Sequence, residues 1–203
     1  LIRGWNESID LSHSDAEPSK LYLARRGISI RQPETLRLHS SLAYFEDRKE
    51  IGTFPAMLAM VQGHGGNAIT IHRTYLTADG YKAPVESPKK LMRYPSQRKL
   101  SGGVIRLMEA GAVLAVAEGL ETALAVMEGT KMPVWCAVNA YLLEHFYPPP
   151  GVSQILVFAD KDRPSAQHPR GHGQESARRL VQRLWERGIK ASAIVTARDI
   201  PAG

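Results

Sequence analysis

The chain has 203 residues, of which 43% are hydrophobic and 23% charged, the composition of a globular protein with one large or two small domains. No apolar run approaches the roughly 20 residues that cross a bilayer, so we expect no membrane partner. The single cysteine, Cys136, excludes a disulfide framework or a cysteine zinc site within this chain and fits a cytoplasmic location. Residues 1–5 lack an initiator Met and any signal-peptide pattern, so we expect a piece of a longer protein.

The net charge of +6 is concentrated in one stretch of the sequence. Between Gly80 and Arg106, seven basic residues stand against one acidic residue, Glu86, so this basic stretch carries the whole positive excess. Its basic residues are Lys82, Lys89, Lys90, Arg93, Arg98, Lys99 and Arg106. Such a block indicates a polyanionic partner. A solvated loop without a partner is the alternative that charge alone leaves open.

The beginning of the chain gives weak structural signals. Residues 1–15 are polar and irregular, and we expect a tail or linker there. The next residues predict a helix over 18–26, which Ser14 or Asp15 would cap and Gly27 would end.

Two strands are predicted next, at residues 54–61 and 68–76, because a glycine-rich turn at 63–67 separates an apolar run from an alternating one. A second turn at 77–80 would complete a small antiparallel meander. The basic stretch that follows contains three prolines, so we expect it to be extended or looped. Together these elements predict a smaller α+β subdomain over residues 16–110.

From residue 111 the sequence alternates between short apolar runs and amphipathic segments. The expected elements are a strand at 113–117, a helix from Leu120 to Gly129, a strand at 133–138, a short helix at 141–146, a strand at 155–159, a helix around 177–185 that ends at Gly188, and a strand at 191–196. This order predicts an α/β fold over residues 111–203, with a central parallel sheet, helices on both faces and right-handed crossovers.

Acidic residues follow two of these predicted strands. Glu118 comes directly after the strand at 113–117, and Asp160 and Asp162 follow the strand at 155–159. In open α/β sheets, ligands bind at the edge where the parallel strands end. Three carboxylates gathered there would repel one another, and a hard divalent cation such as Mg²⁺ or Mn²⁺ is the usual resolution.

The two acidic motifs carry a resemblance to a known family. The run VAEGLETAL at 116–124 and the run VFADKD at 157–162 look like the acidic motifs of the Toprim domain, and are most similar to those of DnaG-like primases from plasmids, phages and integrated elements. Residues 71–88 resemble the primase-core segment that ends in a basic, substrate-binding lysine, and residues 102–107 resemble the linker into such a Toprim domain. The resemblance covers about residues 21–196.

This resemblance implies the catalytic core of a DNA primase, which makes short RNA primers from nucleoside triphosphates on single-stranded DNA. It implies that Glu118, Asp160 and Asp162 are catalytic and hold Mg²⁺ or Mn²⁺, with Glu118 either a metal ligand or the acceptor of the hydroxyl proton. The residues implied in binding nucleic acid or triphosphate are Arg73, Lys82, Lys89 and Lys90. A replicative helicase is a further candidate partner, and its motor would lie outside this chain, which has no Walker loop.

Two features depart from the usual Toprim pattern. Many Toprim domains place Asp four residues after the glutamate, where this chain has Thr122, preceded by Glu121. Positions 118 and 122 lie one helical turn apart, so the second acid of the motif is missing or displaced. The acidic pair is usually followed closely by a glycine that opens the next helix, whereas here a longer basic loop, residues 163–170, intervenes. That loop could contact phosphate or be a surface insertion.

Two other functions remain open at this level. A Toprim nuclease would use the same three acids on a phosphodiester with water as the nucleophile, although the primase-like upstream half argues against it. A non-catalytic replication or mobilisation factor would bind single-stranded DNA through residues 82–106, with a Toprim domain degenerate at Thr122. Product growth that depends on nucleoside triphosphates separates the primase from both.

Overall fold

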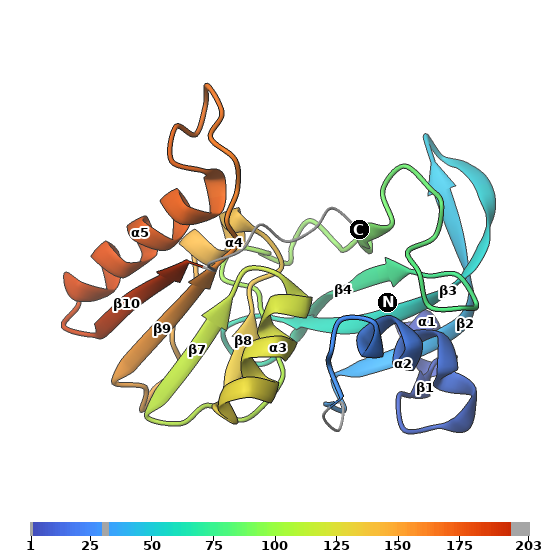
Figure 1. Ribbon diagram of the computed structural model, residues 1–203, viewed down its shortest axis with the longest axis horizontal. Coiled ribbons are helices and arrows are strands. Elements are labelled where there is room, and N and C mark those ends of the chain that lie inside the picture. Colours follow the sequence, from blue (N-terminus) through green and yellow to red (C-terminus); the bar gives the residue numbers. More distant parts are fainter. Residues whose placement is uncertain (1, 30–32, 196–203) are drawn as a thin grey trace. The chain divides into compact units, whose positions relative to one another are not determined.

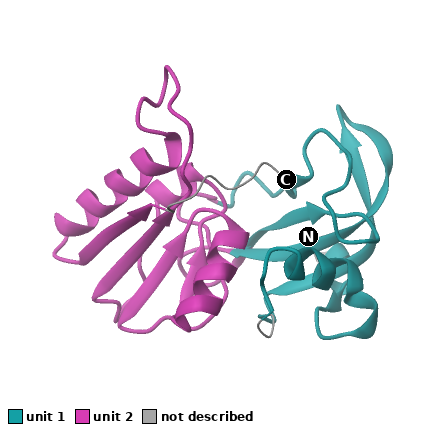
Figure 2. Cartoon of the chain, in the orientation of Figure 1, with its two compact units in different colours: residues 1–61, 69–98 teal, residues 62–68, 99–203 magenta. Residues whose placement is uncertain are grey.

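The computed structural model describes residues 2–29 and 33–195. The chain forms two compact units, residues 1–61 with 69–98 and residues 62–68 with 99–203 (Figure 2). The second unit therefore takes a turn from the first half of the sequence, which we had expected in the upstream subdomain. The reason is a backbone bridge in which Gln62 and Val104 exchange hydrogen bonds of 2.8 and 2.9 Å.

The first unit is built on a five-stranded sheet in the order β1-β2-β3-β4-β5 (Figure 1). Its strands are β1 (Ile9–Asp10), β2 (Leu36–Glu46), β3 (Lys49–Gln62), β4 (Ala68–Tyr75) and β5 (Lys89–Leu91). Its helices are α1 (Ile2–Asn6), the 3₁₀ turn η1 (Ser14–Ala16) and α2 (Glu17–Ala24). The two predicted strands of the meander correspond to β3 and β4, and the part of the basic stretch that lies in this unit is looped apart from the short β5, as expected.

Two parts of the first unit differ from the sequence-based expectation. The described part of the predicted tail, residues 2–15, is folded: β1 pairs antiparallel with β2, and Arg37 of β2 donates hydrogen bonds to Asp10 Oδ1 at 2.9 Å and to Ser8 Oγ at 2.8 Å. The cap of α2 is also different. Ala16 occupies the N-cap position without a side-chain hydrogen bond, because the polar residues before it form the η1 turn.

The second unit contains the predicted parallel sheet, in the order β10-β9-β7-β8-β6 (Figure 1). Its strands are β6 (Ile105–Arg106), β7 (Val113–Ala117), β8 (Val134–Cys136), β9 (Gln154–Ala159) and β10 (Lys190–Val195), and its helices are α3 (Leu120–Thr130), α4 (Ala140–Glu144) and α5 (His172–Trp185). The pairs β10–β9, β9–β7 and β7–β8 are parallel, and β6 adds an antiparallel edge strand that we had not predicted. Residue 196 of the predicted last strand lies outside the described residues.

Helices cover both faces of this sheet, as predicted. Leu114 and Val116 of β7 belong to one core cluster with apolar residues of α4 and α5, such as Leu142 and Leu180. The alternate residue Ala115 is also fully buried but points to the other face, where α3 contacts β7 and β8. Both faces of β7 are therefore shielded from solvent, which explains why such strands appear in the sequence as continuous apolar runs.

Two details of the helices differ from expectation. Helix α3 does not end at Gly129 but runs to Thr130, and Lys131 ends it in the left-handed region with φ 59°. Trp185, in the amphipathic segment that predicted α5, does not lie on the buried face: it is 64% exposed, and its indole N–H donates to the Ala191 carbonyl at 2.8 Å. None of the helices in the described part of the chain has the length and apolar character needed to cross a membrane.

Candidate active site

The acidic residues lie at one edge of the second unit's sheet. Strands β7 and β9 are parallel neighbours with Ala117 paired to Phe158, so the residues that follow them lie side by side. The Glu118 N–H donates to the Phe158 carbonyl at 3.2 Å, which extends the pairing to the first acid. The structure therefore brings Glu118 and Asp160 together at the ends of adjacent strands.

A glycine in the first turn of α5 lies among the three acids. The Gly173 N–H donates to Asp162 Oδ2 at 2.7 Å. A Cβ at position 173 would collide with Glu118 Oε2 and would come within 3.2 Å of both Asp162 Oδ2 and the Asp160 carbonyl oxygen. The three acids can approach one another because this position carries no side chain. Gly173 is not among the predicted site residues, although the Gly-His-Gly sequence at the start of the helix is a visible signal of close approach.

Neighbouring polar groups fix the two aspartates. Thr122 donates its hydroxyl hydrogen to Asp160 Oδ1 at 2.9 Å. The Asp162 backbone is held by the Gln174 side chain, which accepts from the Asp162 N–H at 3.2 Å and donates to the Asp162 carbonyl at 3.0 Å. Thr122, at the place of the missing second acid, therefore orients an acid of the other motif.

The electrostatics of this edge act mainly on Glu118. The pKa of its carboxyl is raised to about 7, first by burial and then by the nearby charges of Asp160 and Asp162, while a backbone hydrogen bond from Ala140 acts in the opposite direction. Its Oε2 atom is enclosed and has no hydrogen-bond partner among the described residues. Without a cation at this edge, Glu118 therefore holds a proton at higher pH than an exposed glutamate does.

The carboxylate oxygens at this edge are the kind of ligand that a hard divalent cation prefers. One of them, Glu118 Oε2, is enclosed and has no hydrogen-bond partner among the described residues. The side chains of the three acids do not converge on one position as a set of metal ligands would. Among the described residues, no group of three or more His, Cys, Asp or Glu is placed to hold a metal ion. Asp162 Oδ2 accepts a hydrogen bond from the Gly173 N–H. Metal binding by Glu118, Asp160 and Asp162 remains a prediction.

The four predicted basic residues belong to the first unit, around β4 and β5. Arg73 pairs with Lys90 across these strands, and its guanidinium donates to the Tyr75 hydroxyl and to the Leu91 carbonyl, both at 2.9 Å. The Lys90 ammonium donates to the Phe45 carbonyl at 2.8 Å and lies 4.1 Å from the centre of the Tyr44 ring. Arg73 and Lys90 thus have internal structural contacts.

The other two basic residues of this set differ in exposure. Lys89 is exposed on β5, and Lys82 is partly buried beside the turn after β4. The structure brings Arg73, Lys89 and Lys90 together on paired strands, and Lys82 joins them through an antiparallel bridge to Leu76. Lys89 is the most accessible of the four for a phosphate group.

Comparisons with known proteins give the chain its family. Residues 1–102 match the family described as a domain of unknown function, DUF7146. The chain belongs to this family. Residues 113–200 match the Toprim domain, so the acidic edge described above is the edge of a Toprim sheet. No curated protein matches the sequence.

Solved structures show the fold of the whole chain. A DnaG catalytic core has a TM-score of 0.61 with 11% identity, over 94% of this chain and 69% of that one. A DnaG primase catalytic domain bound to single-stranded DNA has a TM-score of 0.57 with 9% identity, over 94% and 70%. The primase fragment of the bacteriophage T7 primase-helicase has a TM-score of 0.51 with 15% identity, over 95% and 66%. The DUF7146 chain therefore has the fold of a DnaG-type primase catalytic core.

Proposed function

We propose that this chain is the catalytic core of a DNA primase, which joins nucleoside triphosphates into short RNA primers on single-stranded DNA. The observation that carries the proposal is the gathering of Glu118 and Asp160 at the strand ends of a Toprim sheet, with Asp162 beside them, in a chain with the DnaG core fold over 94% of its length. The chain spans about two thirds of the primase structures it resembles, so the activity of a whole primase is part of the proposal.

The reaction asks the protein to position its substrates and to balance charge, because phosphoryl transfer needs little covalent chemistry from side chains. Glu118, Asp160 and Asp162 would hold a divalent cation that stabilises the attacking and leaving oxygens. Thr122 keeps Asp160 oriented through its hydrogen bond. Glu118, with a pKa of about 7 in the absence of a cation, is either a ligand or the acceptor of the proton from the attacking 3′-hydroxyl.

The basic residues of the first unit would bind the template strand. Lys89 is exposed on β5, and Lys82 and Lys90 lie in the same basic stretch. Contacts between such cations and backbone phosphates are independent of base sequence, which suits an enzyme that must accept many templates. A solved DnaG domain bound to single-stranded DNA has the same fold, which supports this assignment.

The test is a primer-synthesis assay with mixed-sequence single-stranded DNA, all four nucleoside triphosphates and Mg²⁺ or Mn²⁺. We expect products that lengthen only when template and nucleotides are both present. The Asp160→Asn variant should make no product while keeping the unfolding temperature of the wild type. Glu109→Gln, which changes an exposed acid of the same unit, is the matched control and should retain activity.

The two alternatives give different results in the same assay. Shortening of the DNA without nucleotides would identify a nuclease. Binding of single-stranded DNA without turnover under any metal condition would identify a non-catalytic factor, and Thr122 and the Gly173-bound Asp162 are the features that favour it. Either result contradicts the primase assignment.

A further inference from the structure

The basic loop after the acidic pair begins and ends at the acidic edge. It leaves the edge at Arg163, directly after Asp162, and returns at Gly171, where α5 starts. Both ends are tied to the same acid. The Gly173 N–H donates to the Asp162 carboxylate at 2.7 Å, and the Gln174 side chain forms hydrogen bonds with the backbone N–H and the carbonyl of Asp162. Loop residues 163–170 therefore project from the candidate active site as a closed surface loop.

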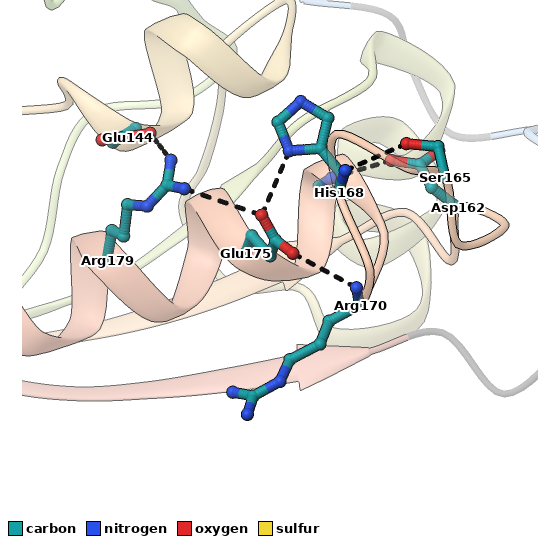
Figure 3. A network of polar contacts seen from close by, with 8 residues as sticks. Glu144, Asp162, Ser165, His168, Arg170, Glu175 and Arg179 are labelled. Atoms are coloured by element: carbon teal, nitrogen blue, oxygen red, sulfur yellow. Dashed lines mark hydrogen bonds and ion pairs between the residues drawn. The ribbon is translucent and has the colours of Figure 1, made fainter.

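A single glutamate of α5 clamps this loop (Figure 3). Glu175 Oε2 lies 3.1 Å from His168 Nδ1, and Glu175 Oε1 accepts from the Arg170 N–H at 3.2 Å. Arg179, one turn along α5, lies 3.6 Å from Glu175 and 2.9 Å from Glu144 of α4. His168, Arg170 and Arg179 together favour the ionised carboxylate, and they hold the pKa of Glu175 below its usual range. The loop is thus anchored to a helix that packs on the sheet.

Further contacts stiffen the loop itself. Ser165 and His168 exchange two hydrogen bonds of 3.0 Å, in which the Ser165 N–H donates to the His168 carbonyl and the His168 N–H donates to Ser165 Oγ. The rings of His168 and His172 stack with centroids 4.1 Å apart. These contacts fix the loop backbone, so side chains on it have a defined position relative to α5.

Two arginines of this anchored loop take no part in its internal side-chain contacts. Arg163 and Arg170 are both exposed. Figure 3 shows the Arg170 side chain extending away from the Glu175 network, which uses only its backbone N–H. Among the described residues, neither guanidinium has an ion pair or a hydrogen bond. Two exposed guanidinium groups on an anchored loop that starts and ends at a carboxylate edge are suited to a compact, highly charged phosphate ligand.

We infer that loop residues 163–170 form a phosphate-binding arm, in which Arg163 and Arg170 bind the triphosphate of the incoming nucleotide and Glu175 is a positioning residue. The inference rests on the proposed function for the identity of the nucleotide. A triphosphate fits better than a DNA strand because the loop is short and both of its ends meet the acids, whereas the longer basic stretch of residues 80–106 suits an extended strand.

The test is calorimetric binding of ATP and of inorganic tripolyphosphate, each with Mg²⁺, to the intact chain. Arg163→Ala and Arg170→Ala should each weaken both ligands about tenfold, the cost of a charge-assisted hydrogen bond. Affinity for a mixed-sequence single-stranded oligonucleotide should stay unchanged. Arg178→Ala removes an exposed arginine of α5 and should leave all three affinities unchanged.

Glu175→Gln tests the clamp separately, because it removes the charge while nearly keeping the shape of the side chain. It should weaken tripolyphosphate binding less than the loss of an arginine does. In a primer assay it should raise the KM for nucleotides and leave kcat unchanged, which a general loss of stability would not do. An unfolding temperature near that of the wild type confirms that the variant is folded.

The outcomes separate this inference from the proposed function. If the arginine variants bind tripolyphosphate as tightly as the wild type does, or lose affinity for single-stranded DNA instead, the inference of a phosphate-binding arm is wrong. If the wild type binds tripolyphosphate through these arginines but makes no primer, the arm stands and the primase assignment fails. If primers form with the same KM in the arginine variants, the primase assignment stands and the arm fails.

Discussion

Thr122 donates a hydrogen bond of 2.9 Å to Asp160 Oδ1, linking the first turn of α3 to the end of β9. This position often carries an acid in Toprim domains, and an acid here would face Asp160 across a short distance. The hydroxyl instead orients the aspartate without adding negative charge. The residue that departs from the first motif therefore contacts an acid of the second.

Thr122→Val should separate this orienting contact from simple packing, because valine has nearly the same shape but no donor. We expect a loss of about 1 kcal/mol in the free energy of unfolding, the usual contribution of one hydrogen bond. Primer synthesis should fall about tenfold if the same contact is needed in the transition state.

Thr130→Val is the matched control, since Thr130 lies at the other end of α3 and bonds to the Val126 carbonyl at 2.6 Å. It should lower stability by a similar amount and leave activity unchanged. Equal activity in the two variants would show that Thr122 has no functional role. The measurements are urea unfolding and the initial rate of primer synthesis.

The raised pKa of Glu118 predicts a pH-dependent stability of the metal-free protein. The carboxyl titrates near pH 4.5 in the unfolded chain and near pH 7 in the folded one, so between these values the folded state binds more protons. Stability must therefore fall as the pH rises from about 4.5 to about 7, by at most about 3 kcal/mol. The measurement is urea unfolding in EDTA across this range.

Glu118→Gln removes the titrating group and should flatten this part of the stability profile. The variant should be more stable than the wild type at pH 8, because the buried charge and its repulsion from Asp160 and Asp162 are gone. The two proteins should converge in stability near pH 4. Parallel profiles for the wild type and the variant would contradict the burial of Glu118.

The fold was more predictable from the sequence than the site. Strands buried on both faces leave long apolar runs, which is why Val113–Ala117 was predicted to its exact ends. Strand β2 gave no such signal, since several of its residues are exposed and its pairing with β3 is irregular. The segment before residue 16 was wrongly predicted to be a tail. Its strand pairs with Leu38 and Arg37, which are distant in the sequence, so local patterns do not indicate the pairing.

The acids of the site could be selected because strand ends are visible in the sequence, but the contacts that organise them could not. The bond from Thr122 to Asp160 joins residues 38 positions apart, and the fit of Gly173 among the acids depends on how α5 returns to the sheet edge. Arg73 was selected as a ligand-binding residue, yet its guanidinium bonds to Tyr75 and Leu91. Sequence patterns indicate which side chains are charged, and the fold decides which of them are already engaged.

Gly173→Ala should lower activity rather than stabilise the helix. Replacing glycine by alanine inside a helix normally gains about 0.5–1 kcal/mol. Here the new methyl group would collide with Glu118 Oε2 and press on the Asp160 carbonyl and the Asp162 carboxylate. We expect Glu118 to be displaced from the acidic edge, with loss of metal-dependent activity and no gain in the unfolding temperature.

Gly129→Ala provides the control for that substitution. Gly129 lies in α3, and no heavy atom would lie within 4 Å of an added Cβ, so the ordinary helical gain should appear. A Gly173→Ala protein that is both more stable and fully active would show that the acids do not need this glycine. Thermal unfolding and primer synthesis on the two variants decide the question.

The last prediction concerns the binding of single-stranded DNA by the basic stretch. Lys89 is exposed, whereas Lys90 also holds the Phe45 carbonyl and the Tyr44 ring, so the two lysines should behave differently when replaced. Lys89→Ala should weaken binding about equally for all sequences. Lys90→Ala should weaken binding and also lower the unfolding temperature, because it removes contacts inside the first unit.

The salt dependence of DNA affinity makes this prediction quantitative. Each phosphate contact that is lost should reduce the slope of log K against log salt by roughly 0.7, the value for single strands. The Lys82→Ala, Lys89→Ala and Lys90→Ala triple variant should therefore show a clearly shallower slope than the wild type on mixed-sequence oligonucleotides. Lys49→Ala, at an exposed position of β3 in the same unit, is the control and should keep the slope of the wild type. An unchanged slope in the triple variant would mean that the basic stretch is a solvated loop, and the case for a primase would then depend on the acidic edge and the fold.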